Sequence, residues 1–158
     1  MTPPVGSPLA PRMATSTRWG TMTNAKELNE RWIRAFNERD WEAERAVRSD
    51  DFVAQMSGAP GPLDNEGWAG FMAMFTNAFT DARINIDSAI EDGDLVASRW
   101  TITGTHDGPF QGVPSTGKSI AMPGVDMSRV VDGKIAEHWA QFDLIAVMQQ
   151  IGAMPAPG

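Results

Sequence analysis

Few side-chain types are available for chemistry in this 158-residue chain, which contains no cysteine, no tyrosine and only two histidines. Thiolate nucleophiles, disulfides and cysteine-type zinc sites are therefore excluded. Proton transfer or nucleophilic attack must use carboxylates, hydroxyl groups, backbone amides or the imidazoles of His106 and His138. Of these groups, Asp126 and His138 stand out, because each lies inside a segment with the pattern of a strand.

Asp126 stands in an apolar segment, Gly-Val-Asp-Met-Ser-Arg-Val, where an aspartate is unexpected. The Asp-Gly turn after this segment decides which residue of the next strand it faces. A two-residue turn places Asp126 opposite Trp139, whereas a three-residue loop with a glycine bulge places it opposite His138. We favour the second register, because it also puts Arg129 and Glu137 on a shared face, where they can pair.

Two interpretations of this pair remain open. A carboxylate and an imidazole that line a concave pocket suit general acid–base catalysis, but a buried Asp–His hydrogen bond can also simply stabilise a sheet. Asp126 and His138 are therefore candidate catalytic residues. Asp143 is a third candidate, although an N-cap role before the last helix explains it without catalysis. Gln55 either points into the pocket or marks a solvent-exposed edge.

Residues 112–119, Gly-Val-Pro-Ser-Thr-Gly-Lys-Ser, match the written form of a phosphate-binding loop. Such a loop needs consecutive backbone amides and a helix that begins at its Lys-Ser end. Pro114 removes one amide, and the residues after Lys118 have a strand pattern, so we expect no nucleotide site. His106 and His138 lack partners at metal-ligand spacing, and we expect neither a metal nor a cofactor.

Helical spacing of apolar residues dominates the first half of the chain, and Asn24 with Glu27 forms a capping-box pattern at its start. After Thr80 the apolar period changes to two, which is typical of half-buried strands. Helices followed by antiparallel strands predict an α+β fold in which a curved sheet wraps around helices. Helices are expected over 25–38, shortly after residue 40, and over 65–79 and 144–151, and strands near 52–56, 84–90, 95–103, 119–131 and 134–142.

Large apolar side chains of these elements are available to line a pocket, and tryptophan and methionine suit a flat organic ligand. The candidate substrate-binding residues are Trp32, Phe36, Gln55, Trp68, Phe71, Met72, Phe75, Trp100, Met122, Ser128, Ala140 and Phe142.

The composition is that of an ordinary globular domain, with 42% hydrophobic and 21% charged residues. The net charge of −7 repels phosphate backbones, so nucleic acid is not an expected partner. No apolar stretch approaches the length of a membrane span, and we expect no membrane association. We expect a disordered or extended arm over 1–24, one domain over 25–153, an irregular tail over 154–158 and a cytoplasmic location.

Three segments together resemble the SnoaL-like polyketide cyclase and ester cyclase family, and the resemblance covers roughly residues 25–153. It implies the nuclear transport factor 2-like fold, a cone of curved sheet closed by helices around an apolar pocket. The segments are residues 104–118 (Gly-Thr-His-Asp-Gly-Pro-Phe-Gln-Gly-Val-Pro-Ser-Thr-Gly-Lys), 129–139 (Arg-Val-Val-Asp-Gly-Lys-Ile-Ala-Glu-His-Trp) and 149–152 (Gln-Gln-Ile-Gly), with Ala-Phe-Asn at 35–37.

The resemblance implies cofactor-independent acid–base chemistry on a hydrophobic, oxygenated small molecule, with polyketide-type or ester cyclisation ranked first. Epoxide hydrolysis or isomerisation, and ligand binding without catalysis, are the alternatives. The characterised cyclases use an aspartate on the last strand and a histidine on the preceding strand. When this sequence is aligned with the family through Asp-Gly-Lys-Ile, the aspartate position holds Ala140 and the histidine position holds Asp126. The carboxylate therefore lies on the preceding strand and not on the last one. The resemblance also implies a homodimer that pairs through sheet faces.

Overall fold

The computed structural model describes residues 24–156 and 158. Apart from Asn24, the predicted arm over 1–24 lies outside these residues. The α+β class and the family fold expected from the sequence are confirmed. Within the described residues the elements are α1 (Ala25–Glu38), α2 (Trp41–Ala46), β1 (Arg48–Met56), α3 (Asn65–Ala78), β2 (Arg83–Asp92), β3 (Leu95–Thr105), β4 (Ser119–Val131), β5 (Lys134–Phe142) and α4 (Leu144–Gln150).

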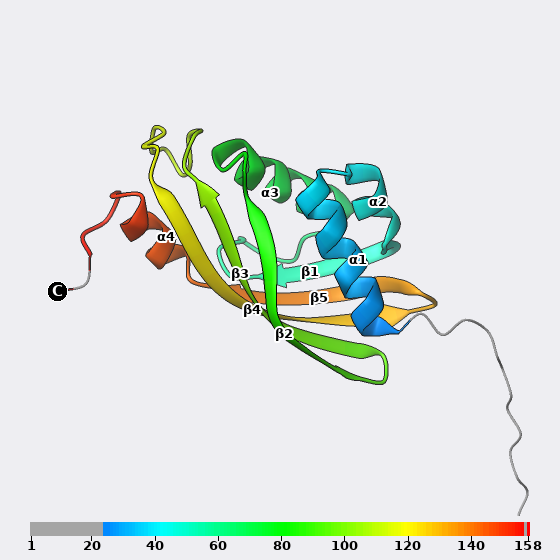
Figure 1. Cartoon of the computed structure of the whole chain (residues 1–158). Coiled ribbons are helices and arrows are strands. Elements are labelled where there is room, and N and C mark those ends of the chain that lie inside the picture. The colour runs from blue at the N-terminus through cyan, green and yellow to red at the C-terminus, as the bar shows by residue number, and fades with distance from the viewer. Residues whose placement is uncertain (1–23, 157) are drawn as a thin grey trace, which may run out of the picture.

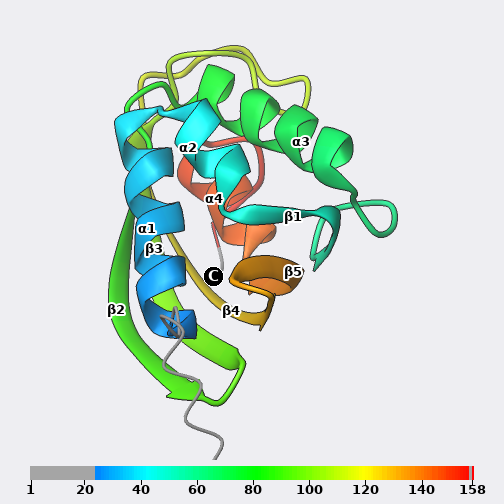
Figure 2. The same ribbon diagram turned by 90° about the vertical axis from the view of Figure 1, so that its right-hand side faces the viewer.

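The strands form one curved sheet in the order β1-β5-β4-β3-β2. β1 runs parallel to β5, and the other neighbours are antiparallel. Helices α1, α2 and α3 lie on the concave side of this sheet, and α4 follows β5 near one end of it (Figure 1). Figure 2 shows the sheet wrapping around the helices. The inward-facing side chains of β3, β4 and β5 therefore lie opposite the helices. None of the helices within residues 24–156 is long and apolar enough to cross a lipid bilayer.

Local sequence explains where the helices begin. The Asn24 side chain accepts a hydrogen bond from the Glu27 amide at 2.5 Å, as the capping pattern predicts. Asp40 and Asp64 cap α2 and α3 in the same way. The residues after Lys118 form β4 and not a helix, so the backbone lacks the geometry that a phosphate-binding loop requires.

Two clusters of buried side chains hold the helices against the sheet. One joins α1, α3 and α4 to β3 and β4 and includes Phe36 and Trp100. The other joins α1 and α3 to β1 and β5 through Trp32, Trp68 and Ile135. Burial of each such side chain contributes about 1.5–3 kcal/mol, so these contacts fix how the helices sit above the sheet.

The hairpin between β4 and β5 closes with the shorter of the two turns considered from the sequence. Val131 pairs with Lys134, which leaves Asp132 and Gly133 as the two turn residues. Their φ angles are 49° and 74°, and positive φ at both positions is the type I′ geometry that Asp-Gly favours.

A bulge directly after this turn shifts the strand register. Ala136 is the extra residue on β5, and from there Asp126 lies opposite Ala140 while His138 lies opposite Ser128. The predicted register with Asp126 opposite His138 was therefore wrong. The two positions that carry the family's aspartate and histidine, Ala140 and Asp126, are direct cross-strand neighbours.

The convex face of the sheet carries the polar side chains expected there. Arg99 and Thr103 are exposed on β3, where buried Trp100 and its neighbours face the other way. Arg129 Nε donates to Glu137 Oε2 at 2.9 Å, so the expected pairing of these two residues is present. The homodimer stays a prediction.

Candidate active site

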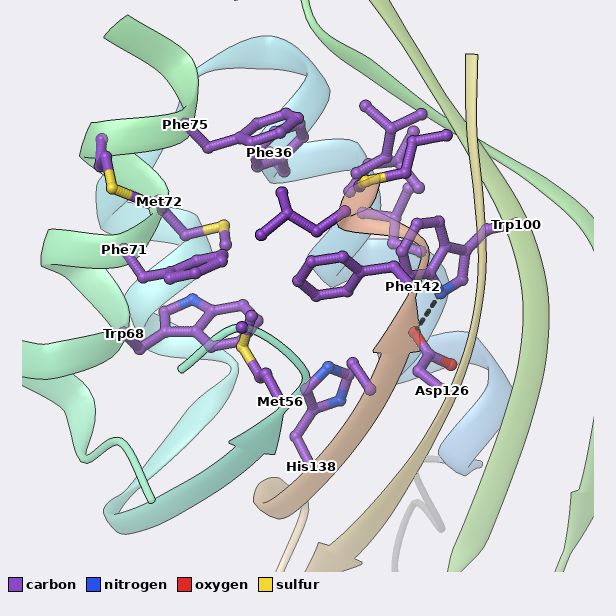
Figure 3. Close-up of a pocket in the computed structure, with 18 of the residues that line it drawn as sticks. Phe36, Met56, Trp68, Phe71, Met72, Phe75, Trp100, Asp126, His138 and Phe142 are labelled. Atoms are coloured by element: carbon purple, nitrogen blue, oxygen red, sulfur yellow. Dashed lines mark hydrogen bonds between the residues drawn. The ribbon is translucent and has the colours of Figure 1, made fainter. Parts of the chain in front are cut away.

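A cavity of about 90 Å³, lined mostly by apolar side chains, lies where the two buried clusters meet. Figure 3 shows side chains of α3 facing those of the sheet across this space, with Asp126 and His138 on the sheet side. Both of these predicted catalytic residues line the cavity. The predicted substrate-binding residues that line it are Trp32, Phe36, Trp68, Phe71, Met72, Phe75, Trp100, Met122, Ala140 and Phe142.

Three predicted site residues lie outside the cavity lining. Gln55 is exposed, because it alternates along β1 with buried Ala54 and so faces away from the helices. Asp143 is exposed and caps α4, accepting a hydrogen bond from the Ala146 amide at 2.9 Å. Ser128 is fully buried beneath the cavity wall. Neither Gln55 nor Asp143 is placed to touch a ligand there.

Asp126 is held in the cavity wall by two donors from β3. The Ser98 hydroxyl donates to Oδ1. The Trp100 indole Nε1 donates to Oδ2 at 3.0 Å (Figure 3). Burial raises the pKa of Asp126 above its ordinary value, and the two hydrogen bonds partly oppose that rise. A carboxyl group with a raised pKa is better matched to taking up and returning a proton near neutral pH than an exposed aspartate.

His138 is a neutral imidazole, because complete burial lowers its pKa to about 3. Its Nδ1 lies 2.9 Å from the Ser128 hydroxyl. The rings of Trp32 and Trp68 meet it edge-on, with centroids at 4.9 Å and 5.3 Å. No hydrogen bond joins His138 to Asp126 among the described residues. The two side chains therefore share the cavity without forming the dyad that the preferred register implied.

A buried ion pair next to His138 was missed by the sequence analysis. Glu44 Oε1 accepts hydrogen bonds from the indoles of Trp32 at 2.7 Å and Trp68 at 2.9 Å, and also from Arg48. Glu44 lines the cavity and is 5% exposed. The only sequence signal is the i,i+4 spacing of Glu44 and Arg48, which is more typical of a solvated helix surface.

Asn29 is a further polar residue of the cavity lining that the sequence analysis missed. Asn29 lies on the buried face of α1, with its Nδ2 3.5 Å from the Ser98 hydroxyl. Its position between Ala25 and Trp32, inside the apolar stripe, is the signal that could have identified it. Among the described residues that line the cavity there is no lysine or arginine, so a ligand meets two carboxylates, the amides of Asn29 and Gln111, and a neutral imidazole.

A curved sheet that encloses a mostly apolar cavity, with a few polar groups in its wall, is an arrangement typical of small-molecule sites. The sequence profile of the SnoaL-like polyketide cyclases matches residues 26–151, and the chain belongs to that family.

Several named proteins resemble the chain. The aklanonic acid methyl ester cyclase DauD of Streptomyces sp. strain C5 is 27% identical over 122 residues, which cover 70% of this chain and 76% of DauD. AclR of Streptomyces galilaeus, a proposed hydroxylase, superposes with a TM-score of 0.78 at 28% identity over 85% of this chain and 84% of AclR. IdmH of Streptomyces antibioticus, a proposed polyketide cyclase, superposes with a TM-score of 0.74 at 34% identity. The superposition covers 81% of this chain and 98% of IdmH. The fold thus carries more than one named reaction.

Proposed function

We propose that this protein is a cofactor-independent acid–base enzyme that cyclises a polyketide-type or ester substrate in the cavity. The observation that carries the proposal is the position of Asp126, a carboxylate without an ion-pair partner among the described residues, in a mostly apolar cavity wall, whose pKa is raised by burial. Family membership and the likeness to an aklanonic acid methyl ester cyclase support the reaction type.

One carboxylate is sufficient for such a ring closure. Asp126 takes a proton from a carbon that is activated by neighbouring carbonyl groups, and the resulting enolate attacks a second carbonyl carbon of the same molecule. A carbon–carbon bond forms, the carbonyl oxygen takes the electron pair, and the protonated carboxyl group returns its proton to that oxygen. The substrate and the product are isomers, so no oxidant or reductant is required. Ser98 and Trp100 fix the carboxyl orientation during both transfers.

His138 fits the role of a neutral hydrogen-bond donor in this scheme. When the Ser128 hydroxyl donates to Nδ1, the hydrogen of the ring is on Nε2, and that N–H is available to a developing enolate oxygen. A pKa of about 3 keeps the imidazole uncharged at neutral pH, so it can polarise the substrate without giving up a proton.

The size of the cavity limits how a substrate enters. About 90 Å³ is less than the roughly 300–1,000 Å³ of pockets that enclose drug-sized ligands. Several of the lining side chains are methionines, whose unbranched chains rearrange readily. We infer that the reacting end of the substrate fills the cavity and that Met56, Met72, Met74 and Met122 adjust around it.

The test is Asp126→Asn, which preserves shape and removes the proton-transfer group. With aklanonic acid methyl ester as the first substrate, followed by chromatography of the product, we expect kcat to fall by about 10²–10⁴-fold. Asp143→Asn is the matched control, because this carboxylate lies outside the cavity, and it should retain wild-type kcat. Full activity in Asp126→Asn would show that the carboxylate is structural.

A second candidate function, ligand binding without catalysis, is favoured by one specific observation. The position of the family's catalytic aspartate holds Ala140, which lies directly opposite Asp126. If the wild-type protein binds cyclase substrates but converts none of them, this second function is the correct one. Ala140→Asp then tests whether a carboxylate on β5 creates turnover.

A further inference from the structure

Asn29 is a buried polar residue whose hydrogen-bonding capacity the protein leaves largely unused. Its side chain is 1% exposed and lines the cavity. Its Oδ1 has no hydrogen-bond partner among the described residues, and its Nδ2 makes only the 3.5 Å contact with Ser98, at the outer limit for a hydrogen bond. A buried acceptor without a donor destabilises a protein, whereas a leucine of similar shape at the same position does not. Stability alone therefore does not explain an amide at this position.

The hydrogen-bond directions identify which amide atom is left for a ligand. Ser98 has one hydroxyl hydrogen, and it is donated to Asp126 Oδ1. The Ser98 oxygen can therefore only accept a hydrogen bond from Asn29. The Nδ2 group of Asn29 must face Ser98 for this reason, and Oδ1 of Asn29 is left as the unpaired atom. Asn29 and Asp126 contact the same hydroxyl group, so both lie at one corner of the cavity.

We propose that Asn29 binds a hydroxyl or enol group of the ligand, which donates its hydrogen to Oδ1 beside the Asp126 carboxylate. A ligand carbonyl at this corner offers no hydrogen and leaves Oδ1 unpaired, and a ligand carboxylate brings a second negative charge to Asp126. The chemical class that fits is thus a neutral, hydroxylated or enolised ring compound. This inference rests on the proposed function in one respect, that a small organic molecule occupies the cavity.

Phenol and toluene are a matched pair of probes for this subsite. Each is a single ring of a size suited to the cavity, and they differ in a hydroxyl against a methyl group. Their affinities for the wild-type protein and for Asn29→Leu, measured by calorimetry, give a phenol-to-toluene preference for each protein. We expect that preference to fall about three- to tenfold in Asn29→Leu, the value of one hydrogen bond to a neutral acceptor.

Asn85→Leu is the matched control, because Asn85 is exposed on β2, does not line the cavity and undergoes the same substitution. Its preference should equal that of the wild type. If Asn29→Leu fails to fold, the side-chain amide resonances of Asn29 are followed by NMR in the wild-type protein instead. Phenol should shift these resonances further than toluene does.

The outcomes separate this inference from the proposed function. An unchanged phenol-to-toluene preference in Asn29→Leu, with both probes bound, overturns the subsite and leaves the cyclase proposal intact. Binding of both probes with the expected loss of preference supports the subsite whether or not a substrate is converted. If neither probe binds the wild-type protein, the subsite is overturned, and the cyclase proposal is decided by its own turnover test.

Discussion

Replacement of Gly124 by alanine should disturb the Asp126 carboxylate without touching it. Gly124 lies opposite Trp100 on the neighbouring strand, and the indole ring covers the glycine. A Cβ atom at Gly124 would lie 2.2 Å from Cη2, 2.4 Å from Cζ2 and 2.6 Å from Cζ3 of that ring. Carbon atoms in contact lie about 3.5–4 Å apart, so the ring must move by more than ~1 Å.

The displaced ring carries the donor that holds Asp126. Trp100 Nε1 lies 3.0 Å from Oδ2, and a shift of that size breaks the hydrogen bond and pushes the indole into the cavity. Overpacking of this kind lowers the free energy of unfolding by about 1–3 kcal/mol. About 0.5–1 kcal/mol of this loss is offset, because alanine is more favourable than glycine within a strand. We expect Gly124→Ala to lower the free energy of unfolding by about 1–2 kcal/mol.

The loss of the Trp100 hydrogen bond should also move the rate–pH profile in a definite direction. That bond lowers the pKa of Asp126, so its removal raises the pKa further above the ordinary value. The acidic limb of the rate–pH profile should therefore move to higher pH in Gly124→Ala, because the base stays protonated over a wider range.

Urea unfolding and the rate–pH profile are the two measurements. Gly70→Ala is the matched control, because Gly70 lies in the exposed part of α3 and a Cβ atom there meets nothing within 4 Å. Gly70→Ala should stabilise the protein by about 0.5–1 kcal/mol and leave the profile in place. If Gly124→Ala has wild-type stability and an unshifted profile, Trp100 does not hold Asp126 in the way described.

Three further predictions concern the ion pair, the histidine and the assembly. Glu44→Leu should cost about 3–5 kcal/mol in urea unfolding, because Arg48 is left buried without its partner, and Arg48→Met in the same chain should recover most of that loss. The pKa of His138 is about 3 in the folded protein against 6.5 for the free side chain, so its contribution to stability is complete above pH 6.5 and is lost as the pH falls towards 3. His138→Gln should therefore show a shallower fall in unfolding free energy over that range, and equal slopes would contradict the shift. For the predicted homodimer, light scattering at micromolar concentration should return the mass of two chains, and a monomer mass would rule the dimer out.

Helix positions and strand positions could be predicted because they depend on local patterns. The predicted range 25–38 agrees with α1, since the capping residue and the apolar stripe are both written within one segment. The same holds for β4 and β5, whose turn residues adopt the positive φ angles that Asp-Gly favours. These features follow from the backbone geometry of the segment itself.

The pairing of Asp126 was not determined by these local patterns. Ile135 and His138 are both buried on the concave side, yet they are an odd number of residues apart, and a regular strand would turn one of them outward. The bulge at Ala136 allows both to be buried, and it also places Ala140 opposite Asp126. This choice depends on what packs above β5, which is Trp32 from α1 and Trp68 from α3.

The surroundings of Glu44 and Asn29 were likewise decided by tertiary structure. The i,i+4 spacing of Glu44 and Arg48 is the same whether the pair is solvated or buried, and it is buried here because two indoles from other helices close over it. The sequence by itself determined the family, the elements and most of the cavity lining. Within the described part of the chain, contacts between segments far apart in sequence decided that Asp126 has no ion-pair partner, that Glu44 is paired and that the Asn29 amide is left unsatisfied. The reason is that burial and hydrogen bonding depend on the packing of the whole domain.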